Sequence, residues 1–259
     1  MAVAAQAAPR YRQVAAELER AIESGGLRPH DRLASERAIA ERHGLSRMTA
    51  RQAVELLVRR GIVYRRPGSG TFVSPPRVIH TLQRLAGFSE QMRAQGIEPS
   101  ARVLEMRRTR RVDAQARAAL ELGPGSRAWM VRRVRFGDRE PLLLETFWVP
   151  DALCPDLARR ELAQGSLYGL MRRRYGIDPC TADESIEPAV LEPADARHLG
   201  ARPGSPAMVV TRTARDREGR AVEFARDVYR GDRARFEVAL TAGEPMVPPR
   251  APSLGLANP

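Results

Sequence analysis

The chain has 259 residues and a formal net charge of +12, and 43% of its residues are apolar, a composition typical of a folded protein with two domains of ordinary size. All 43 basic residues are arginines, which excludes chemistry that needs a lysine, such as a P-loop or a Schiff base. The two cysteines, Cys154 and Cys180, have no paired spacing and no histidine cluster nearby, which argues against a disulfide framework or a structural metal site.

The ends of the chain and its charge distribution lead to further expectations. Residues 1–9 lack the features of a signal peptide, and no apolar run approaches the ~18 residues of a membrane helix, so we expect a cytoplasmic protein without a membrane partner. Residues 1–9 and the proline-rich residues 241–259 are expected to be disordered. Residues 1–76 hold 13 arginines against 7 acidic residues, whereas residues 77–259 hold 30 against 24. This denser positive charge in the front part is typical of a module that binds nucleic acid.

The front part carries the pattern of three helices. Residues 10–24 form an amphipathic helix that ends at residues 25–26. A short helix opens at Ser35, and Gly44 ends it and permits a tight turn. A third helix begins at Ser46, whose hydroxyl can cap it. The apolar stripe of this helix must face a core and comprises Ala50, Ala53, Val54 and Leu57.

A compact strand pair follows the third helix. Residues 64–73 predict strand, tight turn and strand, with Gly68 and Gly70 permitting the positive φ angles of the turn. Helix, turn, helix and basic strand pair in this order indicate a winged helix-turn-helix, whose second helix enters the DNA major groove. We therefore expect double-stranded DNA as a partner. The third helix taken alone would favour a simpler interpretation, an arginine-rich, solvated helix face.

The expected DNA contacts fall into two groups. Arginine is bidentate toward guanine and glutamine toward adenine, which suits residues in the first turns of a recognition helix to read bases. Base reading is assigned to Arg47, Arg51 and Gln52. Contacts to phosphates or support of the contact surface are assigned to Ser35, Arg37, Ser46, Thr49, Arg66 and Gly68. Because one such module reads few bases, we expect a homodimer on a pseudo-palindromic operator.

Beyond the front module the pattern changes to strands and short helices. Residues 74–76 break the periodicity, which predicts a winged module over residues 10–74, a linker over residues 75–81 and a second domain over residues 82–240. Strands are expected at residues 102–111, 128–136, 141–149, 183–191, 207–216 and 221–229. Helices are expected at residues 113–122, 151–163 and 166–175.

The second domain contains a weak internal repeat. Residues 120–126 are echoed by residues 199–205, and a strand, an acidic-glycine turn and a second strand follow each of them. A structural duplication would place two equivalent hairpins in one antiparallel sheet with a groove between the halves, which is an α+β domain. Chance recurrence of Pro-Gly-Ser turns is the alternative.

Several motifs together resemble a known family. The front module resembles the GntR-type bacterial transcription regulators, and the second domain resembles the UTRA effector-binding domain of their HutC subfamily. The stretches that carry the resemblance are residues 33–37 (LASER), 46–49 (SRMT), 64–73 (YRRPGSGTFV), 165–168 (GSLY) and 229–233 (YRGDR). The match covers roughly residues 10–240. Ala34 stands where the family usually has proline and Ala50 where it usually has valine, and neither lies on the expected DNA face.

The resemblance implies a fold and a function. The fold is α+β, an N-terminal winged helix-turn-helix joined to a C-terminal antiparallel sheet domain like that of chorismate lyase. The function is that of a one-component repressor without a cofactor, which works at the nucleoid and is released by a small anionic metabolite such as a sugar phosphate. In relatives the ligand lies beside positions that match Ser89, Arg133, Arg135, Glu145, Ser166, Tyr168, Glu223 and Tyr229.

The chemistry of these residues suits an anion, although simpler interpretations exist. Arg133 and Arg135 are two apart on a strand, so they share one face and can bind an anion together. Ser166 opens a helix, where its hydroxyl adds a donor. The simpler interpretations are an exposed strand face for the arginines, a core aromatic for Tyr168 and an ion-pair partner for Glu145.

Two other functions remain open. A lyase-like enzyme would use the second domain, but the four histidines are isolated and no spacing of a catalytic triad or metal site occurs, so we expect neither catalytic nor metal-binding residues. A ligand-independent DNA-binding protein would leave the second domain unexplained. The sequence leaves the effector, the operator sequence, the sign of regulation and the regulated genes open.

Overall fold

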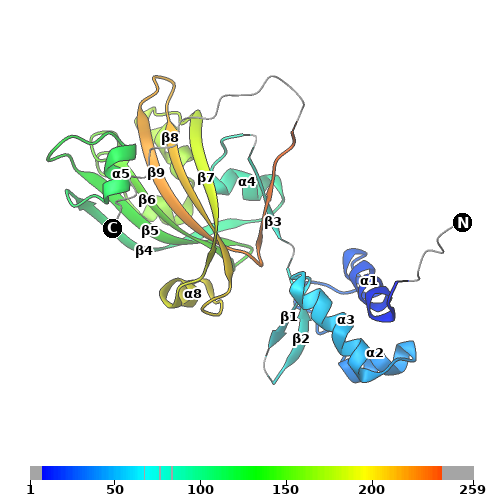
Figure 1. Cartoon of the computed structure of the whole chain (residues 1–259). Coiled ribbons are helices and arrows are strands. Elements are labelled where there is room, and N and C mark those ends of the chain that lie inside the picture. The colour runs from blue at the N-terminus through cyan, green and yellow to red at the C-terminus, as the bar shows by residue number, and fades with distance from the viewer. Residues whose placement is uncertain (1–7, 67, 76, 83, 241–259) are drawn as a thin grey trace, which may run out of the picture.

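The chain folds into two units joined by a short connection (Figure 1). The computed structural model describes residues 8–240 apart from 67, 76 and 83, so the disorder expected for residues 1–7 and 241–259 lies outside the described part. The first unit consists of α1 (Arg10–Glu23), α2 (Glu36–His43), α3 (Arg47–Arg59) and the antiparallel pair β1 (Val63–Arg66) and β2 (Gly70–Val73). This is the predicted winged helix-turn-helix, in which the pair β1–β2 forms the wing.

Local capping determines where α2 and α3 begin and end. Ser35 Oγ accepts a hydrogen bond from the backbone N–H of Ala38 at 3.2 Å, and Ser46 Oγ accepts one from Thr49 at 3.1 Å. Gly44, with φ of 61°, ends α2 in the left-handed conformation that glycine adopts at little cost. The predicted stripe of α3 is buried in one core with residues of α1, α2 and β1.

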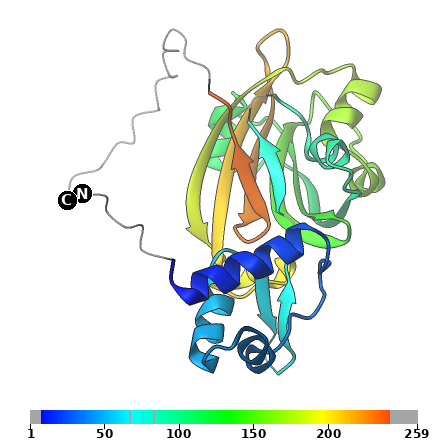
Figure 2. The ribbon, with the colours of Figure 1, turned by 90° about the vertical axis from the view of Figure 1, so that its right-hand side faces the viewer.

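The connection between the two units is itself partly a strand. Residues 75–81 were expected to be a linker, but β3 (Val78–Thr81) pairs in parallel with β10 (Ala234–Glu237), near the end of the described chain. Figure 2 shows these two strands side by side above α1. The His80 ring of β3 stacks on the Phe236 ring of β10 with 5.2 Å between centroids. The connection is therefore anchored on the second unit.

The second unit is built on one six-stranded antiparallel sheet (Figure 1). Its strands are β4 (Pro99–Thr109), β5 (Ala128–Gly137), β6 (Glu140–Pro150), β7 (Thr181–Val190), β8 (Pro206–Arg215) and β9 (Ala221–Arg230). Their order across the sheet is β4-β5-β6-β9-β8-β7. The two hairpins β5–β6 and β8–β9 therefore meet at the centre of the sheet, as the internal repeat predicts.

The helices of the repeat cross over between the two halves of the sheet. In the first half, α5 (Ala114–Ala119) shares a buried apolar cluster with Phe224 of β9. In the second half, α8 (Pro193–Leu199) shares one with Leu144 of β6. Each helix thus packs against the strand of the other half that lies at the centre of the sheet, β9 for α5 and β6 for α8. This packing ties the halves into a single domain.

The remaining helices differ in part from the predicted ones. The helix expected at residues 151–163 begins only at α6 (Arg159–Gln164), because Asp156 has a left-handed φ of 58° that a helix cannot contain. Residues 166–175 form α7 (Leu167–Leu170) and a single π-helical turn, η1 (Met171–Tyr175). The helix α4 (Phe88–Ala94) was not predicted. No helix among the described residues is long and apolar enough to span a membrane.

Candidate functional site

The first candidate surface is the solvent-exposed side of α3 together with the wing. The buried stripe of α3 turns its polar residues outward, and in Figure 1 the wing points away from the large sheet. Of the predicted DNA-contacting residues, Thr49 is half-buried and the others are exposed: Ser35, Arg37, Ser46, Arg47, Arg51, Gln52, Arg66 and Gly68. All but Thr49 are therefore accessible to a ligand from solvent.

Acidic residues hold two of the exposed arginines in place. Arg51 Nε donates to Glu55 Oε1 at 3.0 Å, and this hydrogen bond raises the pKa of Arg51 and lowers that of Glu55. Arg65 of the wing donates to Glu36 Oε1 at 3.0 Å and lies 4.0 Å from Glu55. Recognition helix and wing are thus linked through shared carboxylates, with which a DNA ligand would compete.

Arg66 has a different environment from Arg65. Its guanidinium lies over the rings of Tyr64 and Phe72, at 5.5 and 5.2 Å from their centroids. These contacts fix the cation on the outer surface of the wing, where a contact to a phosphate remains open.

The second candidate site is a polar cluster on one face of the large sheet. The eight residues that the family resemblance assigned to a ligand come together around two adjoining cavities. Seven line a cavity with only about 10 Å³ of free space: Ser89, Arg133, Arg135, Glu145, Ser166, Tyr168 and Glu223. Tyr229 lines the neighbouring cavity of about 470 Å³, and Arg212 lines both.

Arg133 and Arg135 lie side by side on β5 and are only 1% and 2% exposed, which rules out the exposed strand face. Arg133 donates from Nε to Glu145 Oε2 and from Nη1 to the carbonyl oxygen of Leu162, the latter at 2.8 Å. Arg135 donates to Ser89 Oγ at 2.7 Å, and its Nη1 lies 3.8 Å from Glu145 Oε2. Its buried Nε has no hydrogen-bond partner among the described residues. The pair is therefore unequally satisfied: Nε of Arg133 has a partner and Nε of Arg135 has none there.

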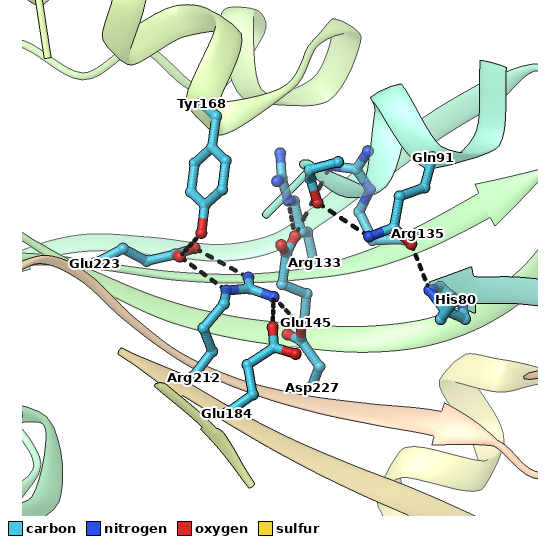
Figure 3. Close-up of polar contacts among 11 residues, drawn as sticks. His80, Gln91, Arg133, Arg135, Glu145, Tyr168, Glu184, Arg212, Glu223 and Asp227 are labelled. Carbon is cyan, nitrogen blue, oxygen red and sulfur yellow. Dashed lines mark hydrogen bonds and ion pairs between the residues drawn. The ribbon is translucent and has the colours of Figure 1, made fainter. Parts of the chain in front are cut away.

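A second set of polar residues lies on β8, β9 and α7 (Figure 3). The Tyr168 hydroxyl donates to Glu223 Oε2 at 2.6 Å, and Arg212 Nε donates to the same oxygen at 3.2 Å. Arg212 Nη1 lies 3.7 Å from Asp227 Oδ2.

The sequence interpretation missed Arg212 and Asp227. Asp227 lies between Glu223 and Tyr229 on β9, at the even spacing that places all three on one face of the sheet. That period would have found it. No comparable signal marks Arg212, which reaches the cluster from β8.

Burial and charge set the protonation of the cluster. Burial, together with the neighbouring Arg133, lowers the pKa of Arg135 to about 9. Burial opposes the charge of Glu145, but Arg133 and Arg135 outweigh it and lower its pKa. Burial raises the pKa of Asp227 well above its usual range, although the charge of Arg212 opposes this shift. Burial therefore favours the neutral acid. Three guanidinium groups then face three carboxylates, Glu145, Glu184 and Glu223, and the Nε–H of Arg135 is a donor left without a partner among the described residues.

The larger cavity is lined in part by His80 of β3. Its Nδ1 lies 3.0 Å from Gln91 Oε1, and its ring meets the Tyr229 ring edge-on with 4.6 Å between centroids. Burial lowers the pKa of His80 to about 4, so the ring is neutral at pH 7.

Acidification should destabilise the second unit through His80. Between pH 6.5 and pH 4 the unfolded chain binds a proton that the folded chain rejects, so this part of the stability is complete above pH 6.5 and is lost as the pH falls. We expect a loss of about 2 kcal/mol between pH 7 and pH 5. The measurement is urea unfolding of the parent and of His80→Phe at both pH values. Carboxylates titrate in both proteins, so their contribution cancels in the comparison. The prediction would be contradicted if the free energy of unfolding changed equally with pH in the parent and in His80→Phe.

Among the described residues no group of histidine, cysteine and acidic side chains is arranged to hold a metal ion. The buried thiol of Cys154 has a pKa raised by burial to about 12, and Cys180 lies exposed away from it.

Family models match both units. Residues 10–73 match the bacterial regulatory proteins of the gntR family, and residues 94–235 match the UTRA domain.

Curated proteins of similar length match nearly the whole chain. The transcriptional repressor NagR of Bacillus subtilis is 36% identical over 88% of this chain and 93% of its own. The mannosyl-D-glycerate transport/metabolism system repressor MngR of Escherichia coli is 29% identical over 88% and 94%. The histidine utilization repressor of Pseudomonas putida is 30% identical over 89% and 91%.

A solved structure shares the architecture. PhnF from Mycobacterium smegmatis superimposes with a TM-score of 0.63 at 30% identity, over 89% of this chain and all of its own. Its separately solved effector domain gives a TM-score of 0.57 at 27% identity, over 63% of this chain and all of its own.

Proposed function

Because this chain belongs to the gntR family of bacterial regulatory proteins and is a DNA-binding transcriptional regulator with a UTRA effector domain, we propose that it acts as a homodimeric repressor. It binds a pseudo-palindromic operator at the nucleoid and is released by a small anionic metabolite. The observation that carries the proposal is the buried pair Arg133 and Arg135. It lies in the unit that β3 connects to the winged module. The relatives are named repressors, which supports the sign of regulation.

The surface of α3 supports the DNA half of the proposal. Arg47, Arg51 and Gln52 are exposed in its first two turns and read bases, whereas Arg66 contacts phosphate. One recognition helix per chain covers few base pairs, so two chains on two half-sites about one helical turn apart supply the specificity.

The unpartnered donor of Arg135 supports the effector half. An anion beside Arg135 would accept a hydrogen bond from its Nε–H, which has no partner among the described residues. With about 10 Å³ free between the seven residues, a phosphate-sized group fits only if they separate. Ser89 of α4, whose Oγ accepts from Arg135, lines this space, and so does Ser166, which caps α7.

If the seven residues move apart around an anion, the movement would be transmitted to the winged module by two routes. The first runs through α4, which follows β3 in the chain. The N-terminal end of α4 lies against Ser166, since a Cβ added at Gly87 would lie 2.9 Å from Ser166 Oγ. The second runs from Tyr229 to Arg233, whose guanidinium lies over the Tyr64 ring of the wing at 5.8 Å from its centroid. Residues 78–81 are paired with β10, so we expect any hinge between the units to lie before Val78.

Reciprocal linkage tests this function. If an anion prefers the dimer arrangement that misfits the operator, it lowers operator affinity by about 1–3 kcal/mol, and operator DNA lowers the affinity for the anion by the same factor. A thermal-shift screen of the full chain against anionic metabolites identifies the ligand, and fluorescence anisotropy with operator DNA measures both affinities. Sedimentation of the free protein as a monomer, or ligand binding without change in operator affinity, would refute the proposal.

The lyase-like enzyme remains a testable alternative. The curated relatives are transcriptional regulators, which argues against a lyase-like enzyme, and we propose that the pocket binds its ligand without turnover. Conversion of chorismate, or of any ligand that the screen finds, would decide for the enzyme.

A further inference from the structure

One large apolar side chain of the DNA-binding unit is exposed to solvent. Met48 is 62% exposed in the first turn of α3, and no other large apolar side chain in the described part of this unit is exposed. The folded state therefore gains little from burial of Met48. Because a single apolar residue on a surface is ordinary, its position on the helix decides what it can do.

Met48 lies at the centre of the outward face of α3. The buried stripe of this helix runs from Ala50 to Leu57, and at about 100° per residue Met48 falls on the opposite side of the helix. Arg51 and Gln52, three and four residues further along, are exposed beside it on the same face. When this face enters the major groove, Met48 is placed among the side chains that read bases.

The neighbours of Met48 leave it uncovered. The Thr49 hydroxyl turns back to the start of the helix, where it lies 2.9 Å from Ser46 Oγ. The Arg51 side chain extends toward the other end of the helix, where its Nε donates to Glu55 Oε1 at 3.0 Å. The apolar surface of Met48 is therefore available to a partner that approaches α3 from solvent.

The chemistry of a methionine side chain limits what it can recognise in the groove. It has no hydrogen-bond donor, and its sulfur is only a weak acceptor, so it is poorly suited to the polar edges of the bases. The apolar group that base edges present in the major groove is the C5 methyl group of thymine. An unbranched, flexible thioether can pack against such a methyl group.

We propose that Met48 reads a thymine methyl group in each half-site of the operator. This proposal rests on the proposed function, since it assumes that α3 enters the major groove of an operator. Arg51 and Gln52 read hydrogen-bonding groups of the bases, and Met48 adds an apolar contact that they cannot make. The operator therefore contains a thymine whose methyl group itself contributes to affinity.

The test removes that methyl group alone. A duplex operator is selected from a random pool with the full-length protein, and each thymine is replaced in turn by deoxyuridine, which keeps every hydrogen-bonding group. The parent should lose about fourfold in affinity at one thymine of each half-site, as expected for one buried methyl group. Met48→Ala should bind the thymine and deoxyuridine duplexes equally well. Fluorescence anisotropy measures the affinities, and because each comparison is made within one protein, any effect of the substitution on folding cancels.

Val190→Ala is the matched control, because Val190 is 59% exposed on β7 of the second unit. It should show the same preference for thymine as the parent. The proposal would be overturned if no thymine methyl group mattered to the parent, or if Met48→Ala kept the parent's preference at every position. The proposed function fails differently: selection would then enrich no sequence, or the selected and scrambled duplexes would bind equally well.

Discussion

Arg135→Met should abolish the response to the effector while leaving operator affinity and folding intact. Arg135 is 2% exposed, its Nε–H has no partner among the described residues, and burial lowers its pKa to about 9, so burying this cation costs folding free energy. Methionine is of similar length and carries no charge, so its burial should leave stability unchanged or increase it. The protein should then stay on its operator at any effector concentration. Urea unfolding and operator anisotropy with and without effector measure the two effects.

Arg133→Met should instead destabilise the folded protein. Arg133 is the main partner of Glu145, which is 5% exposed, and its loss leaves that carboxylate buried with only the distant Nη1 of Arg135. Breaking a buried pair in this way costs about 3–5 kcal/mol. Adding Glu145→Gln to Arg133→Met should restore much of the loss, whereas Arg37→Ala at the surface should change stability by less than about 0.5 kcal/mol. Equal destabilisation by Arg133→Met and Arg135→Met would show that Arg135 is held for structure and not for a ligand.

Arg51→Ala should weaken operator binding by about 1–3 kcal/mol and leave binding to random DNA nearly unchanged, because a bidentate base contact is specific to sequence. Arg66→Ala should weaken both alike and reduce the salt dependence by about one phosphate contact. Arg197→Ala, on the exposed side of α8, is the control and should affect neither. The measurement is anisotropy with operator and scrambled duplexes over a range of salt. An equal loss on both duplexes for Arg51→Ala would remove this residue from base reading.

The winged module could be predicted from the sequence because its signals are local. A serine cap, a left-handed glycine and an apolar stripe at helical spacing each act within a few residues, and Ser46, Gly44 and α3 have the predicted roles. The internal repeat is of the same kind, since each hairpin forms within one short segment. The sequence thus determined the two units, the exposed face of α3 and, through the family motifs, the residues around the pocket.

Tertiary structure alone decided how the pocket is closed and how it is joined to the wing. The parallel pairing of β3 with β10 joins residues that are far apart in the sequence and has no local signal. Arg212 reaches Glu223 and Asp227 only because β8 pairs with β9 in a particular register. Burial then makes the cluster unequal, with Arg133 satisfied, Arg135 short of a partner and His80 neutral. Burial and the positions of partners from other strands are properties of the folded chain, which is why spacing along the sequence does not reveal them.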